Sequence, residues 1–349
     1  MKSSIQSTAG LAQELGLSRW SVSRALNFQP GLNKSTADKI RETARRHGFT
    51  PSLLGRGLRS GKTDLIGVCA PNLVDYFLTD KISRLREAMS KRGLRCVMQI
   101  ISTLPAEENA ALVHFAAMRC AGVVSLASSL RLDDAGIQSL HSAGIPLVRL
   151  DPLLDEFHGE IMTDRAFAMR QAVEHLHCLG HRRLAVMGIN PNHAYGRQRI
   201  RGLQQGCRKQ GLDFNRDVIL LNRDDSGATP DFELGAILSH DYISLGKKRP
   251  AAILALNDRV ALGAMHQLQK QGIRVPRDVS ILGYDNADFC PHVTPSLTSL
   301  DLQAPVLIDN AVKMLLPPSS NKTRTESAGV RIKPRLIIRE STGPAPRNR

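Results

Sequence analysis

From residue 64 onward, short apolar runs alternate with amphipathic segments along the sequence. The amphipathic segments include residues 80–92, 165–179, 197–210 and 258–271. The apolar runs are of strand length and read "LIGVCA", "LRCVMQI", "GVVSLA", "IPLVRL", "RRLAVMG", "DVILL", "AAILAL" and "VSILGYD". Apolar strands that alternate with helices predict a parallel sheet covered by helices on both faces. The region is too long for one sheet of typical size, so we expect two doubly wound lobes.

Polar residues stand just after several of these runs, where the strands of a parallel sheet end. They are Asn72, Asp151, Asn257, Asp258 and Asp285. Ligands of such folds bind beyond the carboxyl ends of the strands. Each residue alone is as compatible with a helix cap as with a ligand contact, but several at equivalent strand ends favour a shared cleft. The sequence therefore predicts a site for a small polar molecule.

Residues 1–50 have a different pattern, which predicts three short helices. Ser7 and Ser18 are the candidate N-caps of the first two helices, and Ser35 is the candidate N-cap of the third. Gly16 ends the first helix, and the turn that follows reads "LGLS". A glycine-containing turn between short helices is typical of a helix-turn-helix, whose second helix enters the major groove of DNA.

The only tryptophan of the chain, Trp20, lies in the second of these predicted helices. Helical spacing turns one set of apolar side chains toward the third helix, namely Leu15, Leu17, Val22 and Leu26. It leaves an outer face that carries Arg19, Trp20, Ser23 and Arg24. We expect Trp20 to be exposed there and to contact another molecule. The alternative, that the indole folds back over the core of the small domain, stays open at this point.

Basic charge is concentrated at the N-terminal end. The formal net charge is +15, and residues 1–62 hold eleven Lys and Arg against Glu14, Asp38 and Glu42, which leaves +8 in this part. Such a concentration suggests a polyanion as partner, although a solvated basic surface is an alternative. Residues 51–63, "PSLLGRGLRSGKT", read as a linker. They are no phosphate-binding loop, because Arg56 stands where the first glycine would be.

Other function classes find little support. The six cysteines are scattered without a CxxC pair, which indicates reduced thiols in a cytosolic protein. The N-terminus lacks the apolar stretch of a signal peptide, and no run is long enough to span a membrane. In "EHLHCLGHRR", His175 and His177 face different ways on a helix, so we expect no metal there. We find no nucleophile elbow and no HExxH motif, and therefore expect neither an enzyme nor a cofactor.

Several blocks resemble, in order, the lactose/galactose repressor family of bacterial transcription regulators. These blocks are "LAQELGLSRWSVSRALN", "HGFTPSLLGRGLRSGKT", "VEHLHCLGHRRLAVMG", "GRQRIRGL", "ILALNDRVALGAM", "RVPRDVSILGYDN" and "RLIIREST". The resemblance implies a DNA-binding head at 1–50, a hinge at 51–63, a periplasmic-binding-protein-like unit of two lobes at 64–341, and a tail at 342–349. It also implies that the chain crosses between the lobes three times. The first lobe would hold about 64–162 and a return near 293–326, and the second lobe about 163–292 and the last strand.

The resemblance also implies site residues. Base-reading positions of the family match Ser18, Arg19, Trp20 and Arg24, with Ser23 and Asn27 nearer the DNA backbone. Leu58 matches a leucine that the family wedges into the minor groove. The sequence departs from the common pattern in Arg19 and Trp20, and in Gly55 and Gly57, which weaken a hinge helix. Effector positions of the family match Asp151, Arg197, Asn257 and Asp285, to which Asn72 is added from its strand end.

These observations predict a dimeric, sequence-specific DNA-binding regulator of transcription, expected to be a repressor in the cytoplasm, at the nucleoid. Its partners would be palindromic operator DNA, a second copy of the chain, and a small effector such as a sugar or related metabolite. The alternative is a cytosolic small-molecule-binding protein, or a sugar-acting enzyme, with an incidental basic N-terminus. Residues 7–62 discriminate between the two, because a transport binding protein would begin with a signal peptide and the first strand of the sheet.

Overall fold

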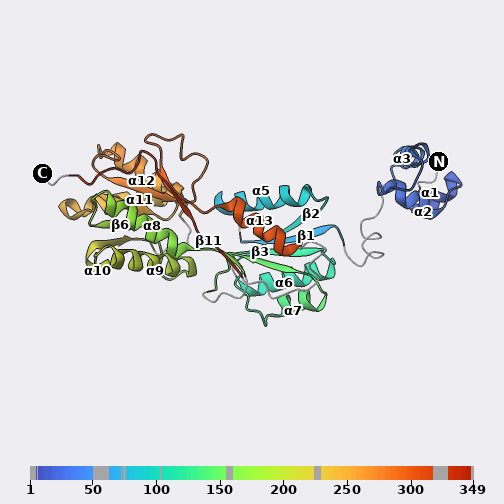
Figure 1. The fold of residues 1–349 in the computed structure, drawn as a ribbon, viewed down its shortest axis with the longest axis horizontal. Helices are drawn as coiled ribbons and strands as arrows, with labels where there is room; N and C mark the ends of the chain where they lie inside the picture. Colours follow the sequence, from blue (N-terminus) through green and yellow to red (C-terminus); the bar gives the residue numbers. More distant parts are fainter. Residues whose placement is uncertain are drawn as a thin grey trace. The chain divides into compact units, whose positions relative to one another are not determined.

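The computed structural model divides the chain into two compact units, residues 1–64 and residues 65–349 (Figure 1). It describes residues 5, 7–49, 63–71, 73, 76–102, 104–154, 160–223, 229–316 and 329–346. The expected hinge lies outside this part except for Thr63, and so do two predicted site residues, Leu58 and Asn72.

The first unit, called the head below, contains the three expected helices. They are α1 (Thr8–Leu15), α2 (Arg19–Leu26) and α3 (Lys34–Arg46). Ser7 caps α1 by accepting from Gly10 N, and Ser18 caps α2 by accepting from Ser21 N at 3.0 Å, as predicted. The prediction for α3 is wrong by two residues. Asn33 is the N-cap, because its Oδ1 accepts from both the amide and the hydroxyl of Ser35.

The three helices enclose a small apolar core. Its buried members are Leu11, Ala12, Val22, Ala25, Ala37, Ile40 and Ala44, and the four side chains predicted to face α3 are packed on it or in it. Gly16 follows α1 with φ +63, a left-handed conformation that glycine adopts without strain. The turn between α1 and α2 is therefore that of a helix-turn-helix.

The second unit contains two six-stranded sheets, which define two lobes. The first sheet has the order β11-β5-β4-β3-β1-β2, from strands β1 (Leu65–Ala70), β2 (Arg95–Ile100), β3 (Gly122–Leu126), β4 (Leu147–Leu150), β5 (Ile161–Thr163) and β11 (Val330–Ile332). Its strand pairs are all parallel. Helices α5 (Tyr76–Ser90) and α13 (Ala304–Leu315) cover one face, and α6 (Pro105–Ala117) and α7 (Ala135–Ser142) cover the other (Figure 1).

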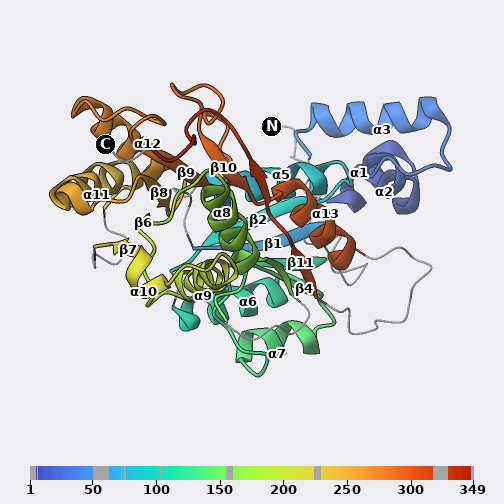
Figure 2. The same cartoon turned by 60° about the vertical axis from the view of Figure 1, so that its left-hand side comes forward.

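The second sheet has the order β12-β10-β9-β8-β6-β7. Its strands are β6 (Leu184–Met187), β7 (Val218–Leu221), β8 (Ala252–Ala255), β9 (Ser280–Tyr284), β10 (Thr298–Asp301) and β12 (Arg335–Ile337). Helices α8 (Arg165–Cys178) and α9 (Ala194–Lys209) pack side by side on one face (Figure 2). The other face carries α11 (Asp231–Ser244) and α12 (Asp258–Lys270), while α10 (Phe214–Asp217) and the 3₁₀ turn Gly246–Lys248 lie in connections.

The chain crosses between the sheets three times, but both expected bounds of the return to the first lobe are wrong. The return was placed near residues 293–326. However, β10 belongs to the second sheet, because it pairs in parallel with β9 and antiparallel with β12. The chain therefore returns after Asp301, when α13 packs on the first sheet, and β11 completes that sheet beside β5.

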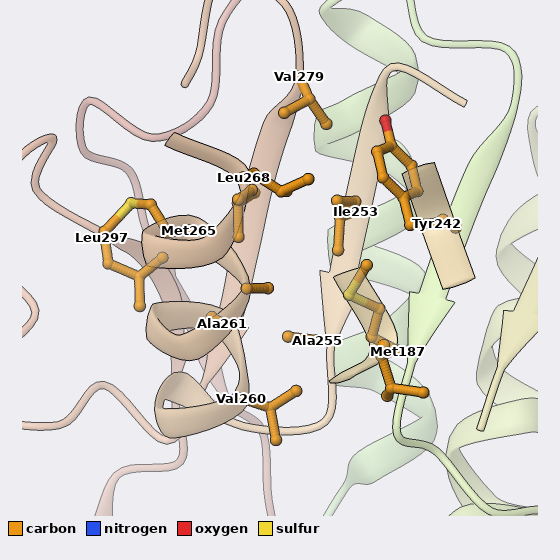
Figure 3. Packing of buried hydrophobic residues seen from close by; sticks show 14 of the residues in the cluster. Met187, Tyr242, Ile253, Ala255, Val260, Ala261, Met265, Leu268, Val279 and Leu297 are labelled. Carbon is orange, nitrogen blue, oxygen red and sulfur yellow. The ribbon is translucent and has the colours of Figure 1, made fainter. Parts of the chain in front are cut away.

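The core of the second lobe shows how tightly its elements pack. Figure 3 shows side chains of α12 and of β8 in one cluster, with Tyr242 of α11 beside them. Helices α11 and α12 approach closely at two glycines. A Cβ at Gly263 would lie 2.0 Å from the carbonyl oxygen of Phe232, and one at Gly235 would lie 2.2 Å from that of Val260. This contact therefore depends on glycine at both positions.

The C-terminal segment is part of the second lobe. Ser341 is buried and its hydroxyl donates to the carbonyl of Ile281, while Gly343 donates to the Ser280 hydroxyl at 3.0 Å. The amide of Ala345 donates to the carbonyl of Leu179. Residues 342–345, assigned to a tail in the sequence analysis, thus pack against this lobe.

Candidate functional sites

The outer face of α2 presents the predicted DNA-reading residues. Trp20 is 58% exposed, which confirms the expectation from helical spacing and excludes the alternative of an indole folded over the core. Arg19 and Trp20 occupy the first turn of α2, directly after the Ser18 cap. Both side chains are exposed. Their position at the helix N-terminus is the one that enters the major groove in helix-turn-helix proteins.

Arg24 is tied to the loop that follows α2. Its Nε donates to the carbonyl of Pro30 at 2.8 Å, and its Nη2 donates to the same oxygen. The guanidinium also lies over the Trp20 ring, 4.7 Å from the centroid. Gly31 leaves room for this arrangement, because a Cβ there would lie 3.2 Å from Nη2. Arg24 therefore supports the indole and the loop in this structure.

Two further residues complete this end of the head. Asn27 ends α2, and its side-chain amide donates back to the carbonyl of Ser23 at 2.7 Å. Phe28 follows with φ +53 and an exposed ring, over which the Arg41 guanidinium lies 4.3 Å from the centroid. The chain thus places two aromatic rings, each with an arginine partner, at the two ends of α2.

Asp151 follows β4 and is buried in a network of charges. Its carboxylate accepts from Lys81 Nζ at 2.5 Å and from Thr163 N at 2.7 Å, and it lies 3.1 Å from Arg165 Nη1. Thr163 Oγ1 also donates to it at 3.2 Å. Burial opposes ionisation, yet the Arg165 and Lys81 cations hold the pKa of the Asp151 carboxyl well below its ordinary range.

This network joins the two lobes. Asp151 and Lys81 belong to the first lobe, whereas Arg165 opens α8 of the second. Tyr195 of α9 donates its hydroxyl to the carbonyl of Asp151, and its ring lies 3.7 Å from the Arg165 guanidinium. Phe77 of α5, which carries Lys81 over its ring, packs on the core of the second lobe. The carboxyl end of β4 is therefore held against α8 and α9.

Asn257 is the N-cap of α12, so the helix-cap reading of this residue is correct. Its Oδ1 accepts from Val260 N at 2.9 Å, and its Nδ2 donates to Asp231 Oδ2 at 3.0 Å. The next residue, Asp258, is buried, with its carboxylate accepting from Ala287 N and the Ser299 hydroxyl. Burial raises the pKa of Asp258 to about 6. Its carboxylate therefore joins the start of α12 to the loop after β9 and to β10.

Asp285 follows β9 with φ +106, and Asp151 has φ +48. Positive φ is uncommon for residues other than glycine, and such strain clusters at functional sites. The two carboxylate residues predicted at strand ends therefore share an unusual backbone conformation. The amide of Asp285 donates to the carbonyl of Leu300, which fixes the loop after β9 to the neighbouring strand β10.

The prediction for α9 selected Arg197, but the structure brings Arg199 to the strand ends instead. Arg197 is exposed, and its Nη1 donates to the carbonyl of Asn192 at 2.9 Å. Two residues along a helix turn side chains through about 200°, so the two arginines face nearly opposite ways. Arg199 is only 8% exposed; it donates to the carbonyl of Leu256 after β8 and lies 4.0 Å from the Tyr284 ring.

Sequence reasoning missed three residues of this region: Arg199, Lys81 and Arg165. In "GRQRIRGL", three arginines alternate at two-residue spacing, and only the phase of the helix decides which one is buried. The sequence held a signal for this phase. The small Gly202 and the apolar Leu203 follow Arg199 by about one turn, and all three are buried on the same face of α9. Lys81 and Arg165 gave no such signal. Their burial depends on Asp151, which lies far from Lys81 in the sequence.

The histidine-rich run at the end of α8 is structural. His175 Nε2 is 3.0 Å from the Thr342 hydroxyl, and the buried His181 is 3.1 Å from both the Ser280 hydroxyl and the Gly343 carbonyl. Both rings therefore hold the C-terminal segment. Among the described residues, we find no group of three or more His, Cys, Asp or Glu side chains placed to share a metal ion. In the same part of the chain, no helix has the length and apolar character that crossing a membrane requires.

Comparison with known proteins identifies relatives over nearly the whole chain. Residues 173–342 match the family model of a periplasmic binding protein-like domain. The HTH-type transcriptional repressor PurR of Vibrio cholerae is 26% identical, over 89% of this chain and 91% of the relative. Catabolite control protein A of Priestia megaterium is 27% identical, over 95% of this chain and 98% of the relative.

Solved structures have the same fold. The lac repressor dimer bound to operator and the anti-inducer ONPF superposes with a TM-score of 0.80 at 22% identity, over 97% of this chain and 99% of the other. A LacI-family regulator from Silicibacter pomeroyi has a TM-score of 0.78 at 19% identity, covering 97% and 99% of the two chains.

The relatives are regulators of transcription rather than enzymes, which sets aside the sugar-acting enzyme considered above. Their similarity includes the helix-turn-helix head as well as the two lobes. Over nearly its whole length the chain is therefore similar to regulators of transcription, and residues 173–342 match the periplasmic binding protein-like domain.

Proposed function

We propose that this protein represses transcription by binding operator DNA as a homodimer, and that a small molecule bound by the two-lobed unit controls this binding. The observation that carries the proposal is the pairing of two features in one chain. An exposed reading helix starts at Arg19 and Trp20, and a two-sheet unit gathers charged residues at its strand ends. Helix α2 would bind DNA, and the two-sheet unit would bind a small molecule. One chain would thus combine the two kinds of binding that a regulated repressor requires.

In this proposal the first turn of α2 reads bases in the major groove. Arg19 would donate to guanine O6 and N7, and Trp20 would pack on a thymine methyl group. Arg24 supports the indole from the loop side, as its contact with Trp20 indicates. Ser18 and Arg24 would also face the bases, whereas Ser23 and Asn27 would lie nearer the DNA backbone. Leu58 would enter the minor groove as a wedge.

The effector would bind at the carboxyl ends of β4, β8 and β9. Asp151, Asp285 and Asn257 lie at these ends, and Asn72 is proposed to join them. Arg199 takes the role that the sequence analysis gave to Arg197, because it is the arginine of α9 that reaches β8 and β9. A similar solved structure is a complex of the transcriptional regulator CelR with cellobiose, and another is a LacI-family regulator from Enterococcus faecium with bound ribose, which supports a sugar or related metabolite as the effector of this chain.

A homodimer would form through the edge of the first sheet. Strand β2 is the last strand of that sheet, and Met98 and Ile100 are exposed apolar residues on it, with Leu104 exposed just after it. Exposed apolar edge strands favour pairing with another chain. Two copies joined here would supply the two heads that a palindromic operator needs.

Selection from random DNA duplexes with the full chain tests the DNA-binding part. We expect an imperfect palindrome to be enriched, with half-sites one helical turn or a multiple apart. Arg19→Ala should relax the base preference at one position of each half-site, by about 1–3 kcal/mol. Arg208→Ala, an exposed arginine of α9, is the matched control and should leave the preference unchanged. If no palindrome is enriched, the proposal that a dimer of this chain reads the operator is wrong.

A thermal-shift screen of metabolites tests the effector part. A ligand that binds only the folded state raises stability by RT ln(1 + [L]/Kd), about 2.7 kcal/mol at a hundredfold excess over Kd. We expect a compound that raises the Tm of the wild type and changes its operator affinity, and that acts on neither Arg199→Ala nor Asp285→Ala. Equal shifts in wild type and both variants would place the ligand elsewhere.

A further inference from the structure

The amino ends of four neighbouring strands in the second sheet carry a concentration of basic side chains. Strands β7, β6, β8 and β9 pair in parallel, so their amino ends lie along one edge, opposite to the edge where the effector is proposed to bind. The connections that lead into these strands, called the basic edge below, are residues 210–217, 179–183, 245–251 and 271–279. They hold eight basic residues, all exposed: Arg182, Arg183, Arg216, Lys247, Lys248, Arg249, Arg274 and Arg277.

Few carboxylates offset this charge. The acidic residues of the basic edge are Asp213, Asp217 and Asp278, which leaves a net +5. Residues 63–349 carry +7 in all, because +8 of the total of +15 belongs to residues 1–62. Two carboxylates on the adjoining helices, Glu174 and Asp241, have basic partners of their own. The basic edge thus holds most of the net charge of the two-lobed unit.

Most cations of the basic edge lack a carboxylate partner in the part of the chain that the structure describes. Two of the eight are paired, each through two hydrogen bonds, namely Arg216 with Asp217 and Arg274 with Asp278. The other six form no ion pair with a described residue. Their connections lie close together, because Arg183 donates to the carbonyl of Lys248 at 2.9 Å. Like charges so placed repel one another, which favours an anionic partner.

Stabilisation of helix ends explains only part of this charge. Cations near a helix C-terminus are favourable, because the last carbonyl groups carry partial negative charge. Arg182 has this role, since it donates to the carbonyl of His177 in the last turn of α8. Four others make no side-chain hydrogen bond or ion pair with a described residue: Lys247, Lys248, Arg249 and Arg277. These four side chains are therefore available to a partner outside the chain.

The chemistry of the basic edge fits the phosphate backbone of DNA better than a protein surface. Protein interfaces have a core enriched in aromatic and apolar side chains. None of the exposed large apolar side chains of the described residues lies in these four connections. Single-stranded nucleic acid would need exposed rings for stacking, but Phe214 packs against the core of the second lobe. Phosphate groups of a duplex, by contrast, are bound by Lys and Arg alone.

The size of the basic edge also fits a duplex. Four strands about 4.8 Å apart span about 15 Å. Each strand of a DNA duplex carries one phosphate per about 3.4 Å of helix axis, so the basic edge would face about four phosphates.

We propose that the basic edge binds the phosphate backbone of a second DNA duplex, without sequence preference. This inference goes beyond the proposed function, which assigns DNA binding to the head alone. The head and the basic edge belong to different compact units of the chain. Each surface would therefore have its own duplex, and the protein would bridge two DNA segments.

The test is a bridging assay with the full chain. A random-sequence duplex is immobilised, the protein is bound to it, and a second, fluorescent random-sequence duplex is added at several salt concentrations. The measurement is the amount of second duplex retained per bound protein. The wild type should retain it saturably, and less of it as salt rises, because counterions are released from each phosphate that is contacted.

The edge variant combines Lys247→Gln, Lys248→Gln, Arg249→Gln and Arg277→Gln. It should retain less of the second duplex, and the slope of log K against log salt for that duplex should become flatter by about 3–4, for four lost phosphate contacts. The double variant Lys247→Gln with Lys248→Gln should flatten the slope by about half as much, and it serves as the test if the edge variant folds poorly.

The control variant removes the same charge from exposed positions of the first lobe. It combines Arg86→Gln, Arg92→Gln, Arg119→Gln and Arg131→Gln. It should bridge two duplexes as the wild type does, because these positions lie outside the basic edge. This comparison separates the local surface from the net charge of the protein. The Tm of each variant, measured by far-UV circular dichroism, shows that it is folded.

Three results would overturn this proposal and leave the proposed function standing. The first is a wild type that binds the immobilised duplex but retains no second duplex. The second is an edge variant that bridges like the wild type, which would assign the second duplex to the other head of a homodimer. The third is displacement of the second duplex by polyglutamate at a lower concentration of charge than by competitor DNA, which would assign the basic edge to an acidic protein. If the wild type binds no duplex at the first step, the proposed function is wrong as well.

Discussion

At the scale of single residues, Trp20 and Arg24 form one unit on the reading helix. The indole is exposed although it is the largest apolar side chain of the head, and the Arg24 guanidinium lies on its ring. Because Arg24 is also bonded to the Pro30 carbonyl, the indole is held in place before any DNA is bound. A pre-positioned ring costs less side-chain entropy on binding.

Trp20 should therefore report DNA binding through its own emission, since all indole fluorescence comes from this position. The free protein should emit like a largely water-exposed indole, and an operator duplex should change intensity and wavelength saturably. Non-specific DNA should change them less, because the head then contacts phosphates without close base contact. Trp20→Ala should lower operator affinity while the Tm of the two-lobed unit stays unchanged. If the emission does not change when operator DNA is added, the proposed contact of Trp20 with the bases is wrong.

Asp258 should make stability depend on pH in a specific direction. Burial raises the pKa of its carboxyl to about 6 in the folded state, above the ordinary value of 3.8. Between these values the folded state binds more protons than the unfolded state, so this group makes stability fall as pH rises from about 4 to about 6. The loss approaches about 3 kcal/mol.

The check is Asp258→Asn, which keeps the shape but cannot ionise. The Tm difference between variant and wild type should move in favour of the variant as pH rises from about 4 to about 7. Lys270→Ala, at the exposed end of the same helix, should show no such drift. A difference independent of pH would mean that Asp258 titrates normally.

At the scale of elements, the edge strand β2 is the feature with the clearest consequence. Its only neighbour in the described sheet is β1, and Met98 and Ile100 lie two residues apart, on the same face. Ile100 is 51% exposed, so an apolar side chain on an open edge faces solvent in the single chain. A second copy of the chain would cover it.

Ile100→Asp should therefore shift the protein from dimer to monomer, since a buried unpaired carboxylate in the interface is costly. Sedimentation velocity measures this directly. Operator affinity should fall in parallel, because a monomer presents one head. Leu132→Asp is the control, an exposed apolar residue of the same lobe outside β2, and should remain dimeric. A dimer unaffected by Ile100→Asp would place the contact on another face.

At the scale of the whole molecule, charge is divided unequally between the units. Residues 1–62 carry +8 of the total of +15, and a dimer doubles this in its two heads. In the proposed function, counterion release would then supply much of the affinity for DNA. The charged network of Lys81, Asp151 and Arg165 is buried and is screened little by salt.

Operator binding should thus depend steeply on salt, whereas the ligand-free Tm of the two-lobed unit should not. With roughly 6–10 phosphates contacted, log K should fall against log salt with a slope of about −5 to −9. A titration of operator affinity at several salt concentrations measures this slope. A slope near zero would exclude the head as the DNA-binding surface.

The sequence alone determined what depends on neighbours a few residues away. The caps at Ser7 and Ser18, the left-handed Gly16 and the exposed face of α2 follow from local hydrogen bonds and helical spacing. Long apolar runs such as β1 and β9 were predicted for the same reason. The strands β5 and β11 are only three residues long, too short for a periodic pattern to identify them.

Tertiary structure alone decided how distant segments meet. That β10 joins the second sheet depends on its pairing with β9 and β12, which no local pattern encodes. Asp151 was correctly placed at a strand end, but its saturation by Lys81 and Arg165 depends on two helices from different lobes. Arg199 rather than Arg197 reaches Tyr284 because packing sets the phase of α9. Local hydrogen bonds and helical spacing decide which residues form helices and strands. Burial and strand pairing decide which of these elements pack against one another.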